Sequence, residues 1–149
     1  MIHMEKNTLI ALMSVFLLAS CAKETSYDYS DFADNKIGVS LVFLGLQSRY
    51  FVYAYSETCS SCQSVKQTVL SYEKNGKTEL YLLNIIGQGI KNVSSADECK
   101  EKDNGSSDPS QIVLFGTPTL FVVSGDYGKK TITDTMIGKY EIGDFLSKN

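Results

Sequence analysis

Two cysteines separated by two residues, Cys59 and Cys62, constrain this chain more than any other feature of its sequence. They follow a stretch at 50–55 that is aromatic or β-branched apart from one alanine, which favours a buried strand. Short polar residues at 56–58 offer helix caps. Apolar residues then recur on one helical face before the stop signal Asn75-Gly76. The sequence therefore predicts a strand that leads into a helix with both cysteines in its first turn.

This position gives the cysteine pair a chemical role. A thiol attacks a disulfide as the thiolate, and its ordinary pKa of about 8.5 leaves it mostly protonated near neutral pH. Unpaired N–H groups and the positive dipole end at a helix start favour the anion. We therefore expect Cys59 to be the attacking catalytic sulfur. We expect Cys62, one turn further on, to be more buried and to resolve the mixed disulfide.

Two other roles are open for the pair, a static disulfide and half of a four-ligand zinc site. Zinc has little support, because the sole histidine is His3, in a segment expected to be removed, and no second close cysteine pair exists. The prediction is a redox pair that needs no metal and no dissociable cofactor. The 149 residues leave room for one domain, 43% of them are hydrophobic, and the net charge of −3 argues against a nucleic-acid partner.

The N-terminal segment carries a targeting signal. Residues 9–18 are mostly apolar, about the length of a signal-peptide core and short for a membrane span. Leu18-Ala19-Ser20-Cys21 resembles the bacterial lipobox, which implies that Cys21 is lipidated and becomes the first residue of the mature protein. An uncleaved anchor is the alternative, and both place the domain outside the cytoplasm. The predicted divisions are a signal peptide at 1–20, a polar tether at 21–35 and a domain at 36–149. The tether is expected to merge into the first structured turn, where Ser30 or Asp31 could cap a short helix that begins near Phe32.

Further along the chain, residues 37–46 are apolar and are expected in the core as either helix or strand. Residues 78–86 read as a buried strand parallel to the first, so Cys59 lies at the carboxyl ends of the strands, where open α/β sheets hold their sites. A short helix at 94–102 contains Cys99, which could be a third redox thiol but is more often a small buried residue at such a position.

Pro118 interrupts an apolar run at 112–123, and it fits there as the first residue of a strand after a turn at Gly116. The Thr117–Pro118 bond is a candidate cis peptide, with an ordinary trans proline as the alternative. The segments at 119–123 and 130–137 flank a glycine-rich turn and predict an antiparallel hairpin, and 141–148 predicts a closing amphipathic helix.

This order of elements, with Cys59-Ser60-Ser61-Cys62 after one strand and Thr117-Pro118-Thr119 opening a later one, resembles the thioredoxin-like family over roughly residues 50–149. The resemblance implies an α/β fold with a central mixed sheet flanked by helices, the cysteines at a helix start, and a cis Pro118 beside both sulfurs. It implies that Thr117 and Pro118, with Ser60 and Ser61, bind an extended substrate segment. Gly138 resembles a glycine that lets the sheet approach this groove.

The chain also departs from thioredoxins. They carry tryptophan before the first cysteine and Gly-Pro between the two, whereas this chain has Thr58 and Ser60-Ser61. Tyr53 stands where thioredoxins place a buried acid, and the nearest carboxylate, Glu57, would raise the pKa of Cys59. The sequence therefore leaves open whether the pair reduces, oxidises or isomerises its substrates.

Two functional hypotheses follow from the sequence. The first is a thiol-disulfide oxidoreductase, a lipid-anchored monomer on the outer face of the bacterial cytoplasmic membrane. It would act on thiols and disulfides of exported proteins and be recycled by a membrane or extracytoplasmic redox partner. The alternative is a lipoprotein that binds a peptide or protein partner, such as an export accessory protein, with a structural Cys59–Cys62 disulfide.

Overall fold

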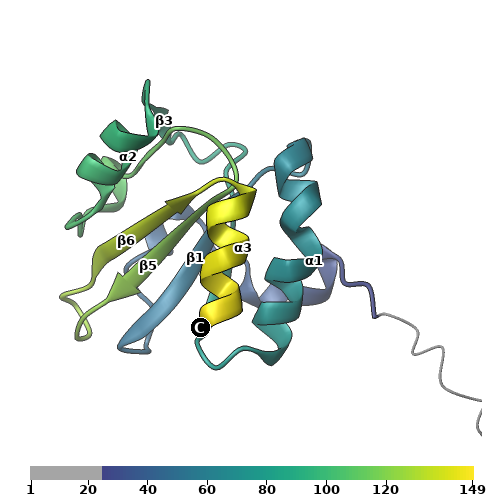
Figure 1. Cartoon of the computed structure of the whole chain (residues 1–149). Helices are drawn as coiled ribbons and strands as arrows, with labels where there is room; N and C mark the ends of the chain where they lie inside the picture. Colours follow the sequence, from purple (N-terminus) through teal and green to yellow (C-terminus); the bar gives the residue numbers. More distant parts are fainter. Residues whose placement is uncertain (1–24) are drawn as a thin grey trace, which may run out of the picture.

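The computed structural model describes residues 25–149, and a four-stranded mixed sheet forms its centre (Figure 1). The strand order is β2-β1-β5-β6, with β1 parallel to β2 and antiparallel to β5, and β6 antiparallel to β5. The strands of this sheet are β1 (Arg49–Tyr55), β2 (Leu80–Asn84), β5 (Thr119–Ser124) and β6 (Thr131–Ile137). A separate parallel pair consists of β3 (Lys91–Asn92) and β4 (Val113–Leu114).

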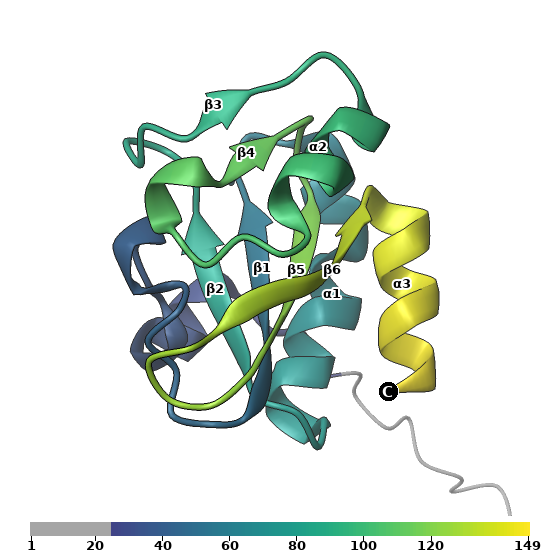
Figure 2. The same cartoon turned by 90° about the vertical axis from the view of Figure 1, so that its left-hand side faces the viewer.

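Helices lie on both sides of the sheet, α1 and α3 on one side and α2 on the other. The helices are α1 (Ser60–Asn75), α2 (Ala96–Asp103) and α3 (Lys139–Lys148), and the 3-10 helices are η1 (Tyr29–Asn35), η2 (Val39–Leu41) and η3 (Pro109–Gln111). The helices α1 and α3 lie side by side along one face of the sheet, and Figure 2 views the molecule from the side on which β4 and α2 lie.

Alternation along β1 separates two apolar clusters. Every second residue, Phe51, Tyr53 and Tyr55, joins the cluster that includes the buried face of α1, whereas Tyr50 and Val52 join the cluster on the opposite face. All five side chains are fully buried. The strand is therefore covered on both faces, as its unbroken run of aromatic and β-branched residues predicts.

Most predicted elements are confirmed. The strand at 50–55, the cysteine helix, the parallel strand within 78–86, the short helix that contains Cys99 and the hairpin all form. The closing helix begins at Lys139, two residues before its predicted start. The α/β class with a mixed sheet flanked by helices is also confirmed.

The segment at 37–46 differs from its prediction as a core element. It forms the short η2 turn, after which Val42 and Phe43 are buried while Leu44 and Leu46 are exposed. The reason is geometric, because a single 3-10 turn presents only a few consecutive side chains to the sheet.

The polar segment ends in a short helix, as expected, but this helix begins at Tyr29 rather than near Phe32, and its cap is Asp28 rather than Ser30 or Asp31. Residues 29–35 form η1, in which Tyr29 and Phe32 are buried, and Asp28 caps it in a reciprocal capping box with Asp31. These residues are part of the folded body. The predicted signal peptide and the lipidated Cys21 lie outside the described residues. Within residues 25–149, no helix combines the length and apolar character of a membrane span.

Candidate active site

The candidate site lies where β1 turns into α1. The strand ends at Tyr55, and Cys59 is the N-cap of the helix, so the cysteine caps its own helix. Its Sγ accepts the backbone N–H of Cys62 at 3.1 Å, which is the role usually taken by a serine or aspartate oxygen. The predicted caps at 56–58 instead form the turn, in which the Ser56 and Thr58 hydroxyls are 3.0 Å apart.

The structure lowers the pKa of Cys59. Burial raises the pKa, but hydrogen bonds from the side chains of Cys62 and Thr117 and from the backbone of Cys62 and Ser61 outweigh it. The side chain remains partly exposed, so the sulfur is open to a partner. A partly exposed thiol with a lowered pKa at a helix start has the character of a nucleophile.

Cys62 has the opposite character. It is fully buried, and its pKa is raised, first by burial and then by its interaction with Cys59. The two sulfurs are both free thiols in the structure and lie one helical turn apart. The contrast between them agrees with the predicted order, in which Cys59 attacks and Cys62 resolves.

The turn before β5 lies beside the site, because β5 is antiparallel to β1 and begins where β1 ends. The Thr117–Pro118 peptide is cis, and the carbonyl oxygen of Thr117 accepts the thiol of Cys59 at 3.2 Å. The N–H of Gly138, the residue before α3, donates to the carbonyl oxygen of Pro118 at 2.9 Å. The structure thus brings together residues that lie about 60 and 80 positions apart in the sequence.

The predicted substrate-binding residues differ in exposure. Ser60 is exposed, and Ser61 and Thr117 are half-buried, so all three can contact a partner. Pro118 is itself buried. The contact that the turn makes with the Cys59 sulfur comes from the carbonyl of Thr117, the residue before this proline.

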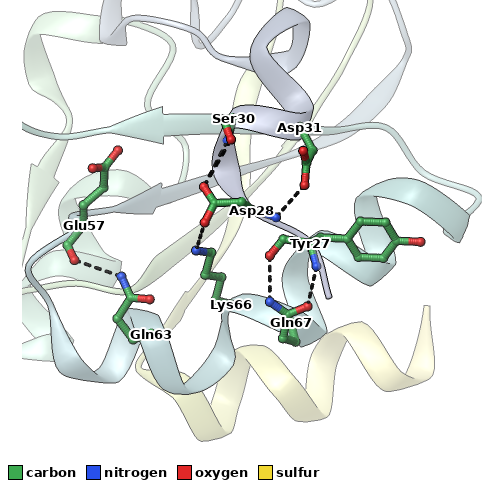
Figure 3. A network of polar contacts seen from close by, with 8 residues as sticks. All are labelled: Tyr27, Asp28, Ser30, Asp31, Glu57, Gln63, Lys66 and Gln67. Atoms are coloured by element: carbon green, nitrogen blue, oxygen red, sulfur yellow. Dashed lines mark hydrogen bonds and ion pairs between the residues drawn. The ribbon is translucent and has the colours of Figure 1, made fainter. Parts of the chain in front are cut away.

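Residues 27–29, predicted as part of the tether, pack against α1. Gln67 of α1 donates to the carbonyl oxygen of Tyr27 at 2.7 Å and accepts its N–H at 2.9 Å, and Lys66 pairs with Asp28 at 2.7 Å (Figure 3). These contacts hold Tyr29 against the core. Because residues 21–35 are mostly polar, their composition does not indicate that Tyr29 is buried in the core.

The third described cysteine, Cys99, belongs to a different environment. It is fully buried in α2, and its thiol donates to the Asp103 carboxylate at 3.2 Å. Burial, and then the hydrogen bond to Asp103, raise the pKa of Cys99 to about 12. It therefore has the buried character expected of a lone cysteine, with an added polar contact.

Among residues 25–149, no three His, Cys, Asp or Glu side chains gather into a group that could hold a metal ion. A scan of the chain against models of protein families finds no match. A search of curated proteins finds no significantly similar sequence.

Proposed function

We propose that this protein is a thiol-disulfide oxidoreductase with a thioredoxin-like fold. The observation that carries the proposal is the partly exposed Cys59 sulfur, which accepts the Cys62 N–H at the start of α1 and contacts the Thr117 carbonyl beside the cis Pro118. This arrangement supplies a stabilised thiolate, a second thiol within reach and a surface beside both for a substrate chain.

The reaction proceeds in two exchanges. The Cys59 thiolate attacks one sulfur of a substrate disulfide, forms a mixed disulfide and displaces the other substrate sulfur as a thiolate. Cys62 then attacks the Cys59 sulfur, the Cys59–Cys62 disulfide forms, and the second substrate sulfur leaves and takes up a proton. The substrate gains two electrons and two protons in this direction, and the same steps in reverse oxidise a dithiol.

The substrates that fit this proposal are exported proteins. The extracytoplasmic location depends on the lipobox-like sequence that ends in Cys21. A protein anchored there would meet newly exported chains, in a compartment where disulfides persist. A membrane or extracytoplasmic redox partner would return the pair to its working state. An extended substrate segment would lie along Ser60, Ser61 and Thr117.

A trapping experiment tests the proposal. In the full chain with Cys62→Ala, Cys59 can attack but no thiol resolves the product, so covalent mixed disulfides should accumulate and disappear on reduction. Non-reducing electrophoresis and mass spectrometry of peptides that contain Cys59 detect them. The matched control is Cys59→Ala, which should trap nothing. If neither variant traps a partner, the chain is a binding module with an inert pair and the proposal is wrong.

A further inference from the structure

Buried tyrosine hydroxyls without partners cluster behind the cysteine pair. Tyr29, Tyr53 and Tyr55 are at most 2% exposed, and their hydroxyls make no hydrogen bond to any of residues 25–149. An unpaired buried hydroxyl costs stability, because it has lost its hydrogen bonds to water. Such a group at a reactive site can be explained when it gains a partner during the reaction.

Stacked rings fix Tyr53 in place. Its ring is parallel to that of Tyr55 within 7°, at a centroid distance of 5.7 Å, and Tyr29 stacks on Tyr55 at 3.9 Å. Because side chains alternate along a strand, Tyr53 lies on the face of β1 that α1 covers, in the same apolar cluster as Cys62. Tyr53 is therefore held on a strand, on the face that packs against the buried side of α1.

The hydroxyl of Tyr53 has two candidate partners, Tyr29 and Cys62. All three residues lie in one apolar cluster, and after burial these two groups are the ones that raise the pKa of Tyr53. The structure forms no hydrogen bond from the Tyr53 hydroxyl to either of them.

The other ionisable groups near this cluster are few. Cys59 contributes to the raised pKa values of Cys62 and Tyr29. The ammonium of Lys66 lies 4.8 Å from the centroid of the Tyr29 ring. Burial, and then the charges of Glu57 and Asp28, raise the pKa of Tyr55 to about 12. Both carboxylates thus affect Tyr55, the middle ring of the stack, and neither is among the groups that shift the pKa of Tyr53.

We propose that the Tyr53 hydroxyl donates a hydrogen bond to the Cys62 sulfur when that sulfur becomes the attacking thiolate, and so assists the resolving step. The inference rests on the proposed oxidoreductase function. It assigns a donor to a sulfur that is fully buried and that must carry negative charge during the reaction.

The step balances without another reactant. The mixed disulfide between Cys59 and the substrate reacts with the Cys62 thiol, the Cys59–Cys62 bond forms, and the substrate leaves as a thiol. The proton of Cys62 passes to the departing substrate sulfur, directly or through solvent. Tyr53 keeps its own proton, as its raised pKa requires, and contributes only the hydrogen bond.

The two exchanges can be timed separately with 5,5′-dithiobis(2-nitrobenzoate). The full chain carries Cys21→Ser to remove one thiol, and Cys99 is protected by burial. In stopped flow with excess reagent, attack by Cys59 releases the first chromophore at a rate that rises with reagent concentration. Resolution by Cys62 releases the second at a rate independent of reagent. Cys62→Ala identifies the first phase, since it abolishes the second.

Tyr53→Phe removes only the unpaired hydroxyl. Tyr55→Phe is the matched control, because it removes another unpaired hydroxyl two residues further along the same face of the strand. We expect Tyr53→Phe to slow the second phase about tenfold or more, the usual effect of losing a hydrogen bond to a charged group, and to move its pH midpoint upward. The first phase should stay unchanged, and Tyr55→Phe should leave both phases unchanged.

Several results would overturn the inference. One is a second phase in Tyr53→Phe within twofold of the parent chain at every pH, with an intact first phase, which would leave the proposed function standing. An equal slowing in Tyr55→Phe would also overturn it, because the effect would then come from packing. Failure of the first phase in the parent chain would instead reject the proposed function.

Discussion

The reactivity of Cys59 depends on a few atoms around its sulfur. One backbone N–H from the first turn of α1 and the neighbouring side chains stabilise the anion, and together they outweigh the cost of partial burial. The Thr117 carbonyl, 3.2 Å away, accepts a proton from the thiol and cannot donate to the thiolate. This contact therefore favours the resting thiol, and the helix start favours the reactive form.

Tyr50 shows how a buried hydroxyl behaves when it has partners. It donates to the carbonyl oxygen of Val42 at 2.8 Å and accepts the N–H of Gly45 at 3.2 Å. Tyr50→Phe leaves both backbone groups unpaired, so we expect the free energy of unfolding to fall by about 1–3 kcal/mol. Urea denaturation followed by circular dichroism measures it.

Tyr53→Phe is the matched control for this prediction. Its hydroxyl has no hydrogen-bond partner among residues 25–149, so its removal should leave the free energy of unfolding nearly unchanged or slightly higher. Equal losses in the two variants would contradict the distinction between paired and unpaired hydroxyls on this strand.

At the scale of elements, residue type predicts β1, helical spacing predicts α1, and a glycine-rich turn between two strand-like segments predicts the hairpin of β5 with β6. Periodicity does not indicate η1, because two buried aromatic residues among many polar ones form no helical or strand period, and only capping residues point to a short helix there. It also failed for residues 37–46, where an apolar run crosses the boundary between the core and the surface. In both segments, contacts with distant elements decide which side chains are buried.

Tyr29 tests whether η1 belongs to the fold. Tyr29→Ala removes a ring that is 2% exposed and stacks on Tyr55, so we expect a loss of about 3 kcal/mol or more in the free energy of unfolding. Tyr29→Phe keeps the ring and removes an unpaired hydroxyl, so it should be nearly neutral. Thermal or urea unfolding compares the two. If Tyr29→Ala unfolds like the parent chain, residues 29–35 are a tether after all.

At the scale of the whole molecule, the fold assembles the site from the start of α1, the turn before β5 and the glycine before α3. The sequence predicts the cysteines as candidates from their spacing after a strand, and Pro118 because it interrupts an apolar run. It cannot predict the contact between Cys59 and the Thr117 carbonyl, or the tyrosines stacked behind the pair. Those contacts depend on how strands from distant positions pair.

The lowered pKa of Cys59 also links global stability to pH. In the reduced protein, the folded state releases the Cys59 proton at a lower pH than the unfolded chain, whose thiol has a pKa of about 8.5. Between these two pKa values the unfolded state binds more protons, so stability rises with pH. The raised pKa of Cys62 lowers stability only as pH passes above about 8.5.

We therefore expect the free energy of unfolding of the reduced parent chain to rise relative to that of Cys59→Ser as the pH is raised toward about 8.5. Serine is a suitable control because it also caps helices and does not titrate in this range. Urea denaturation at several pH values under reducing conditions measures the difference. A difference that stays constant or shrinks with pH would contradict the lowered pKa.

The central claim, that Cys59 is a stabilised thiolate at the start of α1, is tested most directly by its rate of alkylation as a function of pH. The reduced chain is treated with iodoacetamide, and peptide mapping assigns the product to Cys59 or Cys62. We expect the rate at Cys59 to reach half its maximum below the ordinary thiol pKa of about 8.5, while Cys62 stays largely unmodified. A half-maximum at or above that value would contradict it.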